Sequence, residues 1–300
     1  MRIAITGSTG LIGTALTASL RQDGHEIVRL VRHQEPDEAA GERHWSPFGE
    51  PDPGPFEGCE AVIHLAGAGL GDKRWSAAYQ REIRESRVHG TDTLARSLAR
   101  LAEPPKALLS ASAIGFYGDT GAAPVTEQSP GADDFLGALC RDWEAATRPA
   151  QDAGIPVSHL RSGVVLDRSG GALARMLPFF RAGIGGPVGS GKQYFSFIAM
   201  ADYLAAVRLV LTRTADGTLT GPVNLTGPLP VTNRAFSKAL GHVLHRPAVL
   251  PVPGLALRVL FGAMAHELTG SQRVLPARLT DAGFAFTAAD PRAALRSALA

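Results

Sequence analysis

Short apolar runs alternate along the chain with longer segments in which apolar residues recur every three or four positions. The short runs predict buried strands, and the longer segments predict helices with one apolar face. A helix followed by a glycine-rich bend is expected within 170–197, and helical patches are expected from Pro251 onward. Strands are predicted at 2–6, 26–31, 61–65, 107–110, 157–165 and 223–225, and the remaining helices at 11–23, 72–101, 134–152, 200–211 and 233–244.

This alternation predicts an α/β protein built on a Rossmann-type, doubly wound parallel sheet with helices on both faces. Residues 1–165 are expected to form the sheet domain. Beyond them the pattern changes, and a smaller C-terminal lobe is predicted over 166–222 and 227–300, with the strand at 223–226 returning to the sheet. Ligands of open sheets bind beyond the carboxyl ends of the strands, so the lobe is expected to close over that edge.

Composition narrows the function classes. Of the 300 residues, 45% are hydrophobic and 19% charged, which is typical of a soluble globular protein, and the net charge of +2 gives no reason to expect a nucleic acid or membrane partner. No apolar stretch approaches the roughly 18 residues of a membrane helix, and TGSTG interrupts the N-terminal run, unlike a signal peptide. Cys59 and Cys140 are too few for a disulfide framework and predict a cytoplasmic protein. No metal site is predicted, because the nine histidines show no ligand spacing.

The clearest motif lies between the first predicted strand and the first helix, where Gly7, Gly10 and Gly13 form a Gly-x-x-Gly-x-x-Gly loop. The first glycine permits a tight turn, the second lets a pyrophosphate approach the backbone, and the third lets the helix pack closely on the strand. The free N–H groups at the helix N-terminus then bind the anion. The alternative is an ordinary strand–helix turn, but the position of the loop in an α/β chain favours a dinucleotide cofactor.

The end of the second predicted strand indicates which dinucleotide is bound. An acidic residue there would favour NAD, but the strand reads VRLVR and no acid follows until Glu35. Arg32 is placed to pair with a 2′-phosphate, so NADP(H) is predicted in preference to NAD(H); the alternative is a solvated surface arginine. The residues of the glycine loop expected to bind the cofactor are Gly7, Ser8, Thr9, Gly10, Leu11, Ile12 and Gly13.

Several segments also resemble a known family. TGSTGLIG, VIHLAG and SASAIGFYG are similar to the extended short-chain dehydrogenase/reductase superfamily, which includes sugar-nucleotide epimerases and dehydratases. Nearly the whole chain resembles the epimerase-like atypical branch, which carries a conserved C-terminal domain. The further segments that carry this resemblance are, in order along the chain, SRVHGT, DWE, LRSGVVL, GSGKQYFS, NLTGPLPVTN and LPARLTDAGFAF. The resemblance implies that Leu65, Ala66 and Gly67 run past the adenine and ribose side of the cofactor. His64 is expected to be a hydrogen-bonded core histidine rather than a catalyst.

One departure from the family pattern concerns proton transfer. In the superfamily a serine on the fourth strand binds the reacting oxygen, and a Tyr-x-x-x-Lys pair moves the proton. Aligning Glu144 with the usual acid of the helix puts Leu136 and Cys140 at the tyrosine and lysine positions; a shift of one residue puts Phe135 and Leu139 there. Neither pair can act in the usual way. Cys140 is expected to be a buried small hydrophobe rather than a nucleophile.

Two hydroxyls of the SASAIGFYG loop are the candidates for any remaining catalysis. Ser112 stands at about the position of the strand-four serine, and Tyr117 follows five residues later between two glycines. The Tyr117 hydroxyl either serves a substrate oxygen or is hydrogen-bonded beneath the loop, with the ring packed there. Both alternatives stay open at the level of the sequence.

Three further residues are candidate substrate contacts. Arg87 stands where many relatives have an asparagine; it is expected to bind a substrate carboxylate or a loop carbonyl, or else to form an interior salt bridge with Glu127 or Glu144. Lys192 and Tyr194 lie on the glycine-rich bend, which is expected to face the nicotinamide from the lobe. Lys192 is the basic group of that bend that would serve an anionic substrate.

Two functions fit these observations. The first is an NADP(H)-binding atypical short-chain dehydrogenase, acting as an oxidoreductase or epimerase on a small polar, sugar-like substrate. The alternative is a catalytically silent protein that binds NADP(H) as a sensor or scaffold. The missing Tyr/Lys pair favours the second, whereas Ser112 and its polar loop favour the first. A monomer or homodimer with a small-molecule substrate is expected in the first case.

Overall fold

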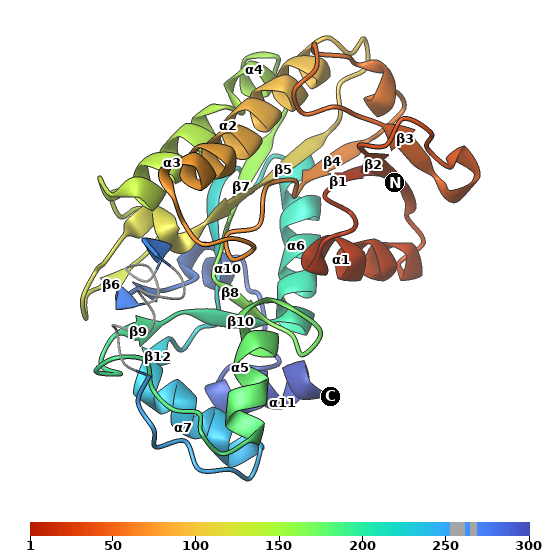
Figure 1. The fold of residues 1–300 in the computed structure, drawn as a ribbon. Helices are drawn as coiled ribbons and strands as arrows, with labels where there is room; N and C mark the ends of the chain where they lie inside the picture. The colour runs from red at the N-terminus through yellow and green to blue at the C-terminus, as the bar shows by residue number, and fades with distance from the viewer. Residues whose placement is uncertain (253–261, 265–268) are drawn as a thin grey trace.

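A computed structural model describes residues 1–252, 262–264 and 269–300. Within them, seven parallel strands form one central sheet in the order β3-β2-β1-β4-β5-β7-β11 (Figure 1). The predicted Rossmann-type sheet is therefore confirmed, including the late strand that returns to it. Its strands are β1 (Arg2–Thr6), β2 (Glu26–Val31), β3 (Glu42–His44), β4 (Ala61–His64), β5 (Ala107–Ala113), β7 (Val157–Ser162) and β11 (Gly221–Leu225).

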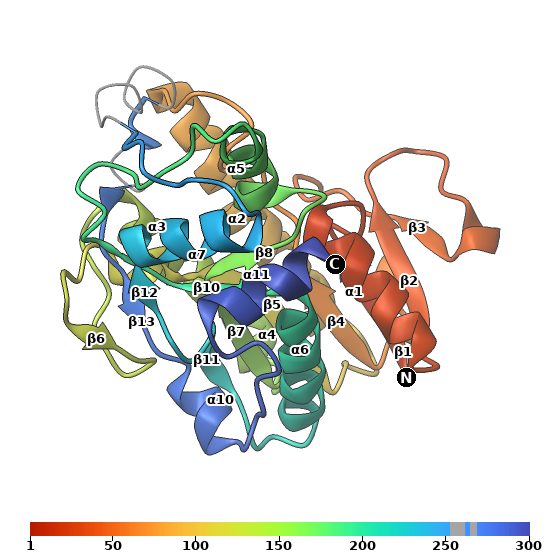
Figure 2. The same ribbon diagram turned by 90° about the horizontal axis from the view of Figure 1, so that it is seen from below.

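Helices cover both faces of this sheet, because successive side chains of a strand point to opposite sides. Ile3 and Ile5 share one apolar core with α1 and α6, whereas Ala4 shares a second core with α2 and α4 (Figures 1 and 2). The helices that flank the sheet are α1 (Leu11–Gln22), α2 (Ala77–Ala99), α3 (Phe135–Ala145), α4 (Arg148–Asp152) and α6 (Met200–Ala215).

Two strand predictions need correction. The edge strand β3 was not predicted, because it is short and polar; Glu42 is held there by ion pairs to Arg29 and His33 rather than by apolar packing. The predicted strand at 157–165 is two strands. It ends at Ser162, and after one glycine the chain continues as β8 (Val164–Leu166), which pairs with β10 (Phe197–Ala199) outside the central sheet.

Two helix predictions were too long. The predicted helix at 134–152 is divided into α3 and α4, since Pro149 has no N–H to donate to the carbonyl of Ala145. The predicted helix at 72–101 begins only at Ala77. Ser76 is its N-cap, and the Ser76 hydroxyl accepts a hydrogen bond from the N–H of Tyr79 at 3.2 Å.

A smaller lobe lies at the carboxyl ends of the strands and has an apolar core of its own, built around Phe180, Phe197, Phe236 and Leu295. In this lobe α7 and α11 lie next to each other (Figure 2). Part of the helical stretch predicted after Pro251 falls on residues 253–261 and 265–268, which lie outside the described residues. The remaining elements are α5 (Gly171–Arg181), β9 (Tyr194–Phe195), β12 (Val231–Thr232), α7 (Asn233–Val243) and α11 (Pro291–Leu299), with β6 (Pro124–Val125), β13 (Arg273–Val274) and α10 (Ala277–Asp281) beside the sheet.

Helix α6 falls within the range predicted for the lobe, yet it packs on the central sheet. Near its N-terminus, the buried carboxylate of Asp202 accepts hydrogen bonds from the N–H and hydroxyl of Thr287 and from the N–H of Ala288, at 2.6–3.0 Å. These bonds attach the C-terminal segment to a helix of the sheet. The exact division into a sheet domain and a lobe stays a prediction.

Replacing Asp202 by alanine tests this attachment. Three donors lose a charged acceptor in a place that is 1% exposed, so we expect the free energy of unfolding in urea to fall by about 3 kcal/mol. Asp216→Ala is the matched control, because the exposed Asp216 also accepts from the N–H and hydroxyl of one threonine, Thr218. Asp216→Ala should lower the free energy of unfolding by about 0.5 kcal/mol or less. Equal losses in the two variants would show that the Asp202 bonds do not stabilise the fold.

Candidate cofactor and active site

The glycine loop lies at the carboxyl end of β1, and each glycine meets a different constraint. Gly7 has φ of +67°, and a Cβ built on it would lie 2.8 Å from the carbonyl carbon of Leu65. A Cβ on Gly13 would lie 2.8 Å from Cα of Ser8. Gly10 is the exposed N-cap of α1, where a Cβ would meet only the oxygen of Gly7, at 3.4 Å. Gly7 and Gly13 are thus required by packing, and Gly10 leaves the helix N-terminus open.

The loop also carries donors without partners. Ser8 is 4% exposed, and its Oγ has no hydrogen-bond partner among the described residues. No side chain caps α1, and the first N–H groups of a helix have no acceptors within it. The hydroxyl of Thr9 is exposed beside them. A buried orphan hydroxyl next to an uncapped helix N-terminus fits a bound diphosphate.

A small pocket of about 270 Å³ adjoins this loop. The lobe contributes Asp167 and Ser169 to it, and these two residues were missed at the level of the sequence. A Cβ on Gly170 would lie 3.0 Å from Cδ1 of Leu11, so the start of α5 contacts the start of α1. The glycines at 170 and 171, directly after Asp167 and Ser169, were the available signal in the sequence. The pocket is lined by Thr9, Gly10, Leu11, Thr14, Ala15, Asp167 and Ser169.

The segment after β4 is fixed to β1. The N–H groups of Leu65 and Ala66 donate to Oγ1 of Thr6, at 3.1 and 3.2 Å. The same hydroxyl shares a hydrogen bond with Nδ1 of His64, whose Nε2 is 3.0 Å from Oγ1 of Thr91. His64 is therefore a satisfied core histidine, as predicted. Its hydrogen bonds hold the segment in which Leu65 and Ala66 are partly exposed.

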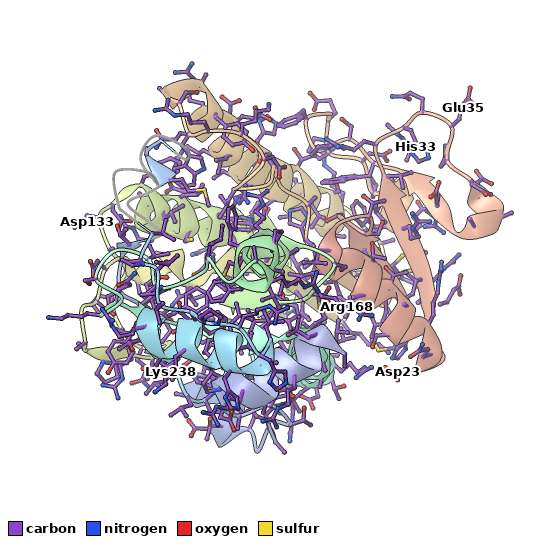
Figure 3. All side chains as sticks on the ribbon, turned by 60° about the horizontal axis from the view of Figure 1, so that its bottom comes forward. Asp23, His33, Glu35, Asp133, Arg168 and Lys238 are labelled. Atoms are coloured by element: carbon purple, nitrogen blue, oxygen red, sulfur yellow. The ribbon has the colours of Figure 1, made fainter. Side chains whose placement is uncertain are left out.

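Arg32 lies directly after β2 and is exposed, and within the described parts of the chain it forms no ion pair. Glu35, the first acid after this strand, is exposed on a loop that extends from the edge of the sheet (Figure 3). His33, between them, pairs with Glu42. The end of β2 therefore presents the cation of Arg32, and the acid beside it, Glu42, is engaged by His33 and Arg29.

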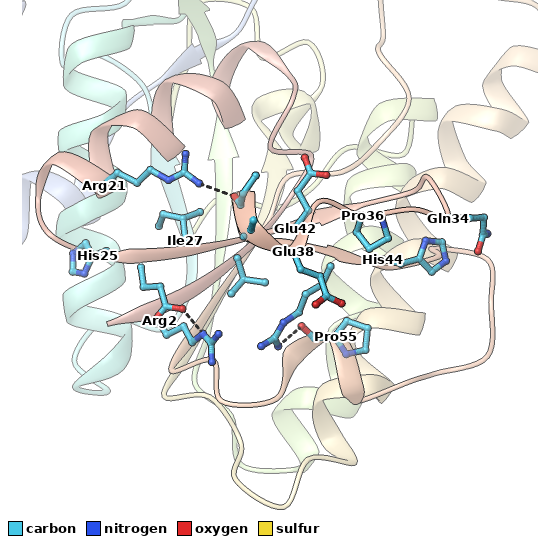
Figure 4. A pocket seen from close by; sticks show the side chains of 16 residues that line it. Arg2, Arg21, His25, Ile27, Gln34, Pro36, Glu38, Glu42, His44 and Pro55 are labelled. Carbon is cyan, nitrogen blue, oxygen red and sulfur yellow. Dashed lines mark hydrogen bonds and ion pairs between the residues drawn. The ribbon is translucent and has the colours of Figure 1, made fainter.

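A larger pocket, of about 880 Å³, lies beneath that same loop, against β2 and β3 (Figure 4). Its cations are already engaged: Arg2 pairs with Glu26, and Arg21 and Arg43 donate to the carbonyls of Ala40 and Pro55. The pocket shares no lining residue with the glycine loop. With its donors satisfied within the chain, it is a poor candidate for the functional site.

Ser112 lies near the end of β5 and directly opposite Arg161 on β7. Its hydroxyl donates to Oε1 of Glu144 on α3, at 2.7 Å. The carboxylate of Glu144 also forms a bidentate pair with Nε and Nη2 of Arg161, at 2.7 and 2.8 Å. With its proton engaged by Glu144, Ser112 offers lone pairs to any further partner and is placed to accept a hydrogen bond from a hydroxyl.

Tyr117 belongs to the same network and is only 4% exposed. Its hydroxyl donates to Oδ1 of Asn224 at 2.7 Å and accepts from Nη1 of Arg161 at 3.0 Å. Burial raises the pKa of Tyr117, although Arg161 opposes the shift. Of the two alternatives for Tyr117, this arrangement favours the hydrogen-bonded ring beneath the loop. Arg161 and Asn224 were given no role at the level of the sequence, and Glu144 was considered only as an alignment point and as a partner of Arg87, although each lies in a quoted motif.

The helix α3 presents no proton-transfer pair toward this network. Leu136 is largely buried, and Cys140 is 2% exposed, with its thiol 3.7 Å from the carbonyl oxygen of Ala113. Burial raises the pKa of Cys140 to about 12. The prediction that Cys140 is a buried hydrophobe is confirmed, and an uncharged thiol occupies the place of the lysine.

Arg87 is the second buried arginine near the site, with 8% of its surface exposed. The salt bridge considered for it, to Glu127 or Glu144, is wrong: Glu144 pairs with Arg161, and Glu127 accepts from the backbone N–H of Asn224. Instead, Nη1 of Arg87 donates to the carbonyl of Ile83 in its own helix. The remaining donors of the guanidinium have no partner among the described residues.

The lobe residues lie beside the Ser112 loop. The carbonyl of Tyr194 accepts from the N–H of Gln272, whose side chain donates to the carbonyl of Ile114 at 3.4 Å. Tyr194 is half-buried under the guanidinium of Arg273, whereas Lys192 is exposed. Tyr194 is thus joined to the loop through Gln272, but no contact brings Lys192 to Ser112.

The described residues contain no group of three His, Cys, Asp or Glu side chains arranged to hold a metal ion. Among the helices described, none is long and apolar enough to cross a membrane.

Comparison with known proteins identifies the family. Residues 3–135 match the NAD dependent epimerase/dehydratase family, and residues 252–298 match a domain of unknown function (DUF1731). Epimerase family protein Mb2239 of Mycobacterium bovis is 43% identical over 286 residues, which cover 95% of this chain and 93% of that protein. The chain belongs to the NAD-dependent epimerase/dehydratase family. The resemblance drawn from the motifs is confirmed.

Solved structures of the family agree with this fold. The human epimerase family protein SDR39U1, in a crystal structure with NADPH, has a TM-score of 0.89 and 34% identity, with 100% of this chain and 99% of that chain covered. UDP-N-acetylglucosamine 4-epimerase of Bacillus cereus has a TM-score of 0.76 at 16% identity, covering 100% of this chain and 98% of that one, and shares the fold. The SDR39U1 proteins of human and cattle are 35% and 38% identical, with each chain covered in full.

The buried His64 gives a testable pH dependence of stability. Burial lowers its pKa from 6.5 to about 4, so between these values the unfolded chain binds a proton at this position that the folded chain does not. The contribution of neutral His64 is therefore fully present above pH 6.5 and is lost as the pH falls toward 4, a change of about 3 kcal/mol. His64→Gln should flatten this part of the curve of unfolding free energy against pH. His89→Gln, at an exposed position, is the control and should leave the pH dependence of the unfolding free energy unchanged. If the His64→Gln variant also shows the wild-type pH dependence, the role assigned to His64 is refuted.

Proposed function

We propose that the protein binds NADP(H) and acts as an oxidoreductase or epimerase on a small polar, sugar-like substrate. The observation that carries this is the glycine loop, with its uncapped helix N-terminus and the buried, partnerless hydroxyl of Ser8. Arg32 at the end of β2 supports the phosphorylated dinucleotide, because it is exposed and the neighbouring acid, Glu42, is engaged by Arg29 and His33. The human family member crystallised with NADPH adds further support.

In this proposal the residues of the loop bind the diphosphate through backbone N–H groups and the hydroxyls of Ser8 and Thr9. Arg32 pairs with the 2′-phosphate, and the segment from Leu65 to Gly67 lies along the adenine and ribose side of the cofactor. Bound NADP(H) supplies or accepts a hydride. The backbone groups at the start of α1 that take part are those of Leu11, Ile12 and Gly13.

Ser112 is the proposed catalytic contact to the substrate. Because its proton is engaged by Glu144, its lone pairs accept from a substrate hydroxyl and orient the carbon that carries it. A proton-transfer role for Tyr117 requires its hydroxyl to leave Asn224, so we assign Tyr117 to holding Arg161 in place and keep direct catalysis as a secondary hypothesis. Lys192 and Tyr194 are proposed to approach the substrate from the lobe.

The alternative is a catalytically silent NADP(H)-binding sensor or scaffold protein. Leu136 and the neutral, buried Cys140 favour it, because neither side chain can act as the proton-transfer pair that the resemblance places at these positions. In either case we propose that residues 1–165 bind the cofactor and that the lobe, at 166–222 and 227–300, faces the substrate or a partner. A cytoplasmic location and a monomeric or homodimeric state stay predictions from the sequence.

The proposed role of Arg32 can be measured as a cofactor preference. A charge-assisted pair with a 2′-phosphate is worth roughly 1.5–3 kcal/mol, so Arg32→Ala should weaken NADPH binding by about tenfold to a hundredfold and leave NADH binding nearly unchanged. Nucleotide fluorescence titrations report both affinities. Gly10→Val is the positive control: its Cβ has room within the protein, so the fold should persist while both cofactors are lost. An unchanged preference in Arg32→Ala would remove that arginine from the site.

Activity separates the enzyme from the silent protein. The protein is incubated with NADP⁺ or NADPH and a panel of small hydroxy and carbonyl compounds. The absorbance of the reduced nicotinamide reports an oxidoreductase, and the proton NMR spectrum of the compounds reports an epimerase, which consumes no net cofactor. We expect turnover, and we expect Ser112→Ala to lower kcat by about tenfold or more. Cys140→Ala should be nearly neutral for kcat. Tight NADPH binding without turnover of any compound would favour the silent alternative, and a loss of activity only in Cys140→Ala would place the catalyst on α3.

A further inference from the structure

The two buried arginines near the site are neutralised very differently. Arg161, 4% exposed, has its charge balanced by the bidentate carboxylate of Glu144. Arg87, 8% exposed, forms no ion pair with any described residue. A buried cation without a counter-charge is costly, and such groups are normally paired. Among the described residues the charge of Arg87 is therefore unbalanced, and the guanidinium is available to an anion.

Within residues 1–252, 262–264 and 269–300, no acidic group forms an ion pair with Arg87. Its guanidinium carbon lies 5.0 Å from the ring centre of Trp143, a favourable cation–π contact that leaves the charge in place. Burial lowers the pKa of Arg87, opposed only by Cys140 and Tyr79. Neither is a carboxylate: the pKa of Cys140 is raised to about 12, and the hydroxyl of Tyr79 donates to the carbonyl of Gly69.

The guanidinium of Arg87 is nevertheless within reach of a ligand through Gly67. This residue is exposed, and a Cβ built on it would lie 3.3 Å from Cζ of Arg87. No side chain of residue 67 therefore covers the guanidinium. Behind it, Ser86 holds the segment in place by accepting the N–H of Ala68 at 3.1 Å. An anion placed over Gly67 meets the positive charge of Arg87 at Cζ and Nη1, which are among the atoms closest to this position.

The donors that remain indicate the shape of the anion. Nη1 of Arg87 is used by the carbonyl of Ile83, which leaves Nε and Nη2, the side edge of the guanidinium. In Arg161 the same edge binds both oxygens of Glu144. Two parallel donors on one edge match the two oxygens of a planar carboxylate.

We propose that Arg87 binds a carboxylate of the substrate, so that the substrate of this protein is an acid, such as a sugar acid, rather than a neutral polyol. The proposal rests on the proposed function and narrows its substrate class. The position favours the substrate over a cofactor phosphate, because the guanidinium stacks on Trp143 of α3, the helix whose Glu144 binds Ser112, rather than on the diphosphate loop at α1.

The first test measures stability. If Arg87 serves to bind a ligand and does not stabilise the fold, replacing this cation by the similarly long methionine should leave the melting temperature unchanged or raise it. Arg87→Lys keeps the charge and should melt near the wild-type temperature. A fall of several degrees in Arg87→Met, or its failure to fold, would overturn the proposal, because the arginine would then be structural.

The second test measures carboxylate binding by the NADPH-loaded protein. Sodium acetate and sodium glucuronate are titrated against sodium chloride at constant ionic strength, with the fluorescence of the tryptophans as readout, since Trp143 stacks on Arg87. We expect saturable binding that weakens at least tenfold in Arg87→Met and partly in Arg87→Lys. Arg81→Met, an exposed position on the same helix, is the control and should match the wild type. The absence of a carboxylate effect in the wild type would overturn the proposal.

NADPH affinity, measured on the same variants, separates the remaining outcomes. An unchanged NADPH affinity in Arg87→Met together with lost carboxylate binding supports a substrate anion. A parallel loss of NADPH binding would assign Arg87 to a cofactor phosphate and overturn the proposal. If the wild type binds no NADPH, the proposed function fails; carboxylate binding to the cofactor-free protein, with the same dependence on Arg87, would then still support an acid-binding site.

Discussion

The ion pair between Glu144 and Arg161 is the constraint on which the site depends. It joins α3 to β7, and through the hydroxyls of Ser112 and Tyr117 it reaches β5 and, by Asn224, β11. Removing one partner of such a buried pair typically costs about 3–5 kcal/mol, because the other charge is left uncompensated. The pair therefore fixes the relative positions of three strand ends where the sheet meets its ligands. A helix that has lost its proton-transfer residues is still held against the sheet by this contact.

The fold could be predicted from the sequence where local pattern and buried environment agree. Runs such as Arg2–Thr6 and Ala61–His64 are apolar because both faces of the strand are covered, so their composition alone identifies them. The prediction failed where a tertiary contact replaces local propensity. Strand β3 is polar and is held by Glu42 ion pairs, and the break after Ser162 reflects a change of pairing partner, which no short window of sequence contains.

The same distinction holds for the site. The glycine loop could be located because backbone geometry demands glycine at Gly7 and Gly13. The network around Ser112 could not, because its members come from positions up to 112 residues apart and only the folded sheet brings them together. Arg87 was noticed in the sequence, but its lack of a partner is a property of the whole environment. A salt bridge from Arg87 to Glu144 was a reasonable expectation, but in the structure the carboxylate of Glu144 pairs with Arg161.

The sheet and the lobe are connected by very short crossings. One residue separates β7 from β8, and α6 begins at the residue after β10, so a lobe strand runs directly into a helix of the sheet. Hinged enzymes close around their ligands by rotating domains about a few loop residues that absorb the change of angle. Here these two crossings leave little chain to serve as such a hinge. Crossings this short couple the lobe directly to the sheet, so a displacement of β7 or α6 would be passed on to β8 or β10.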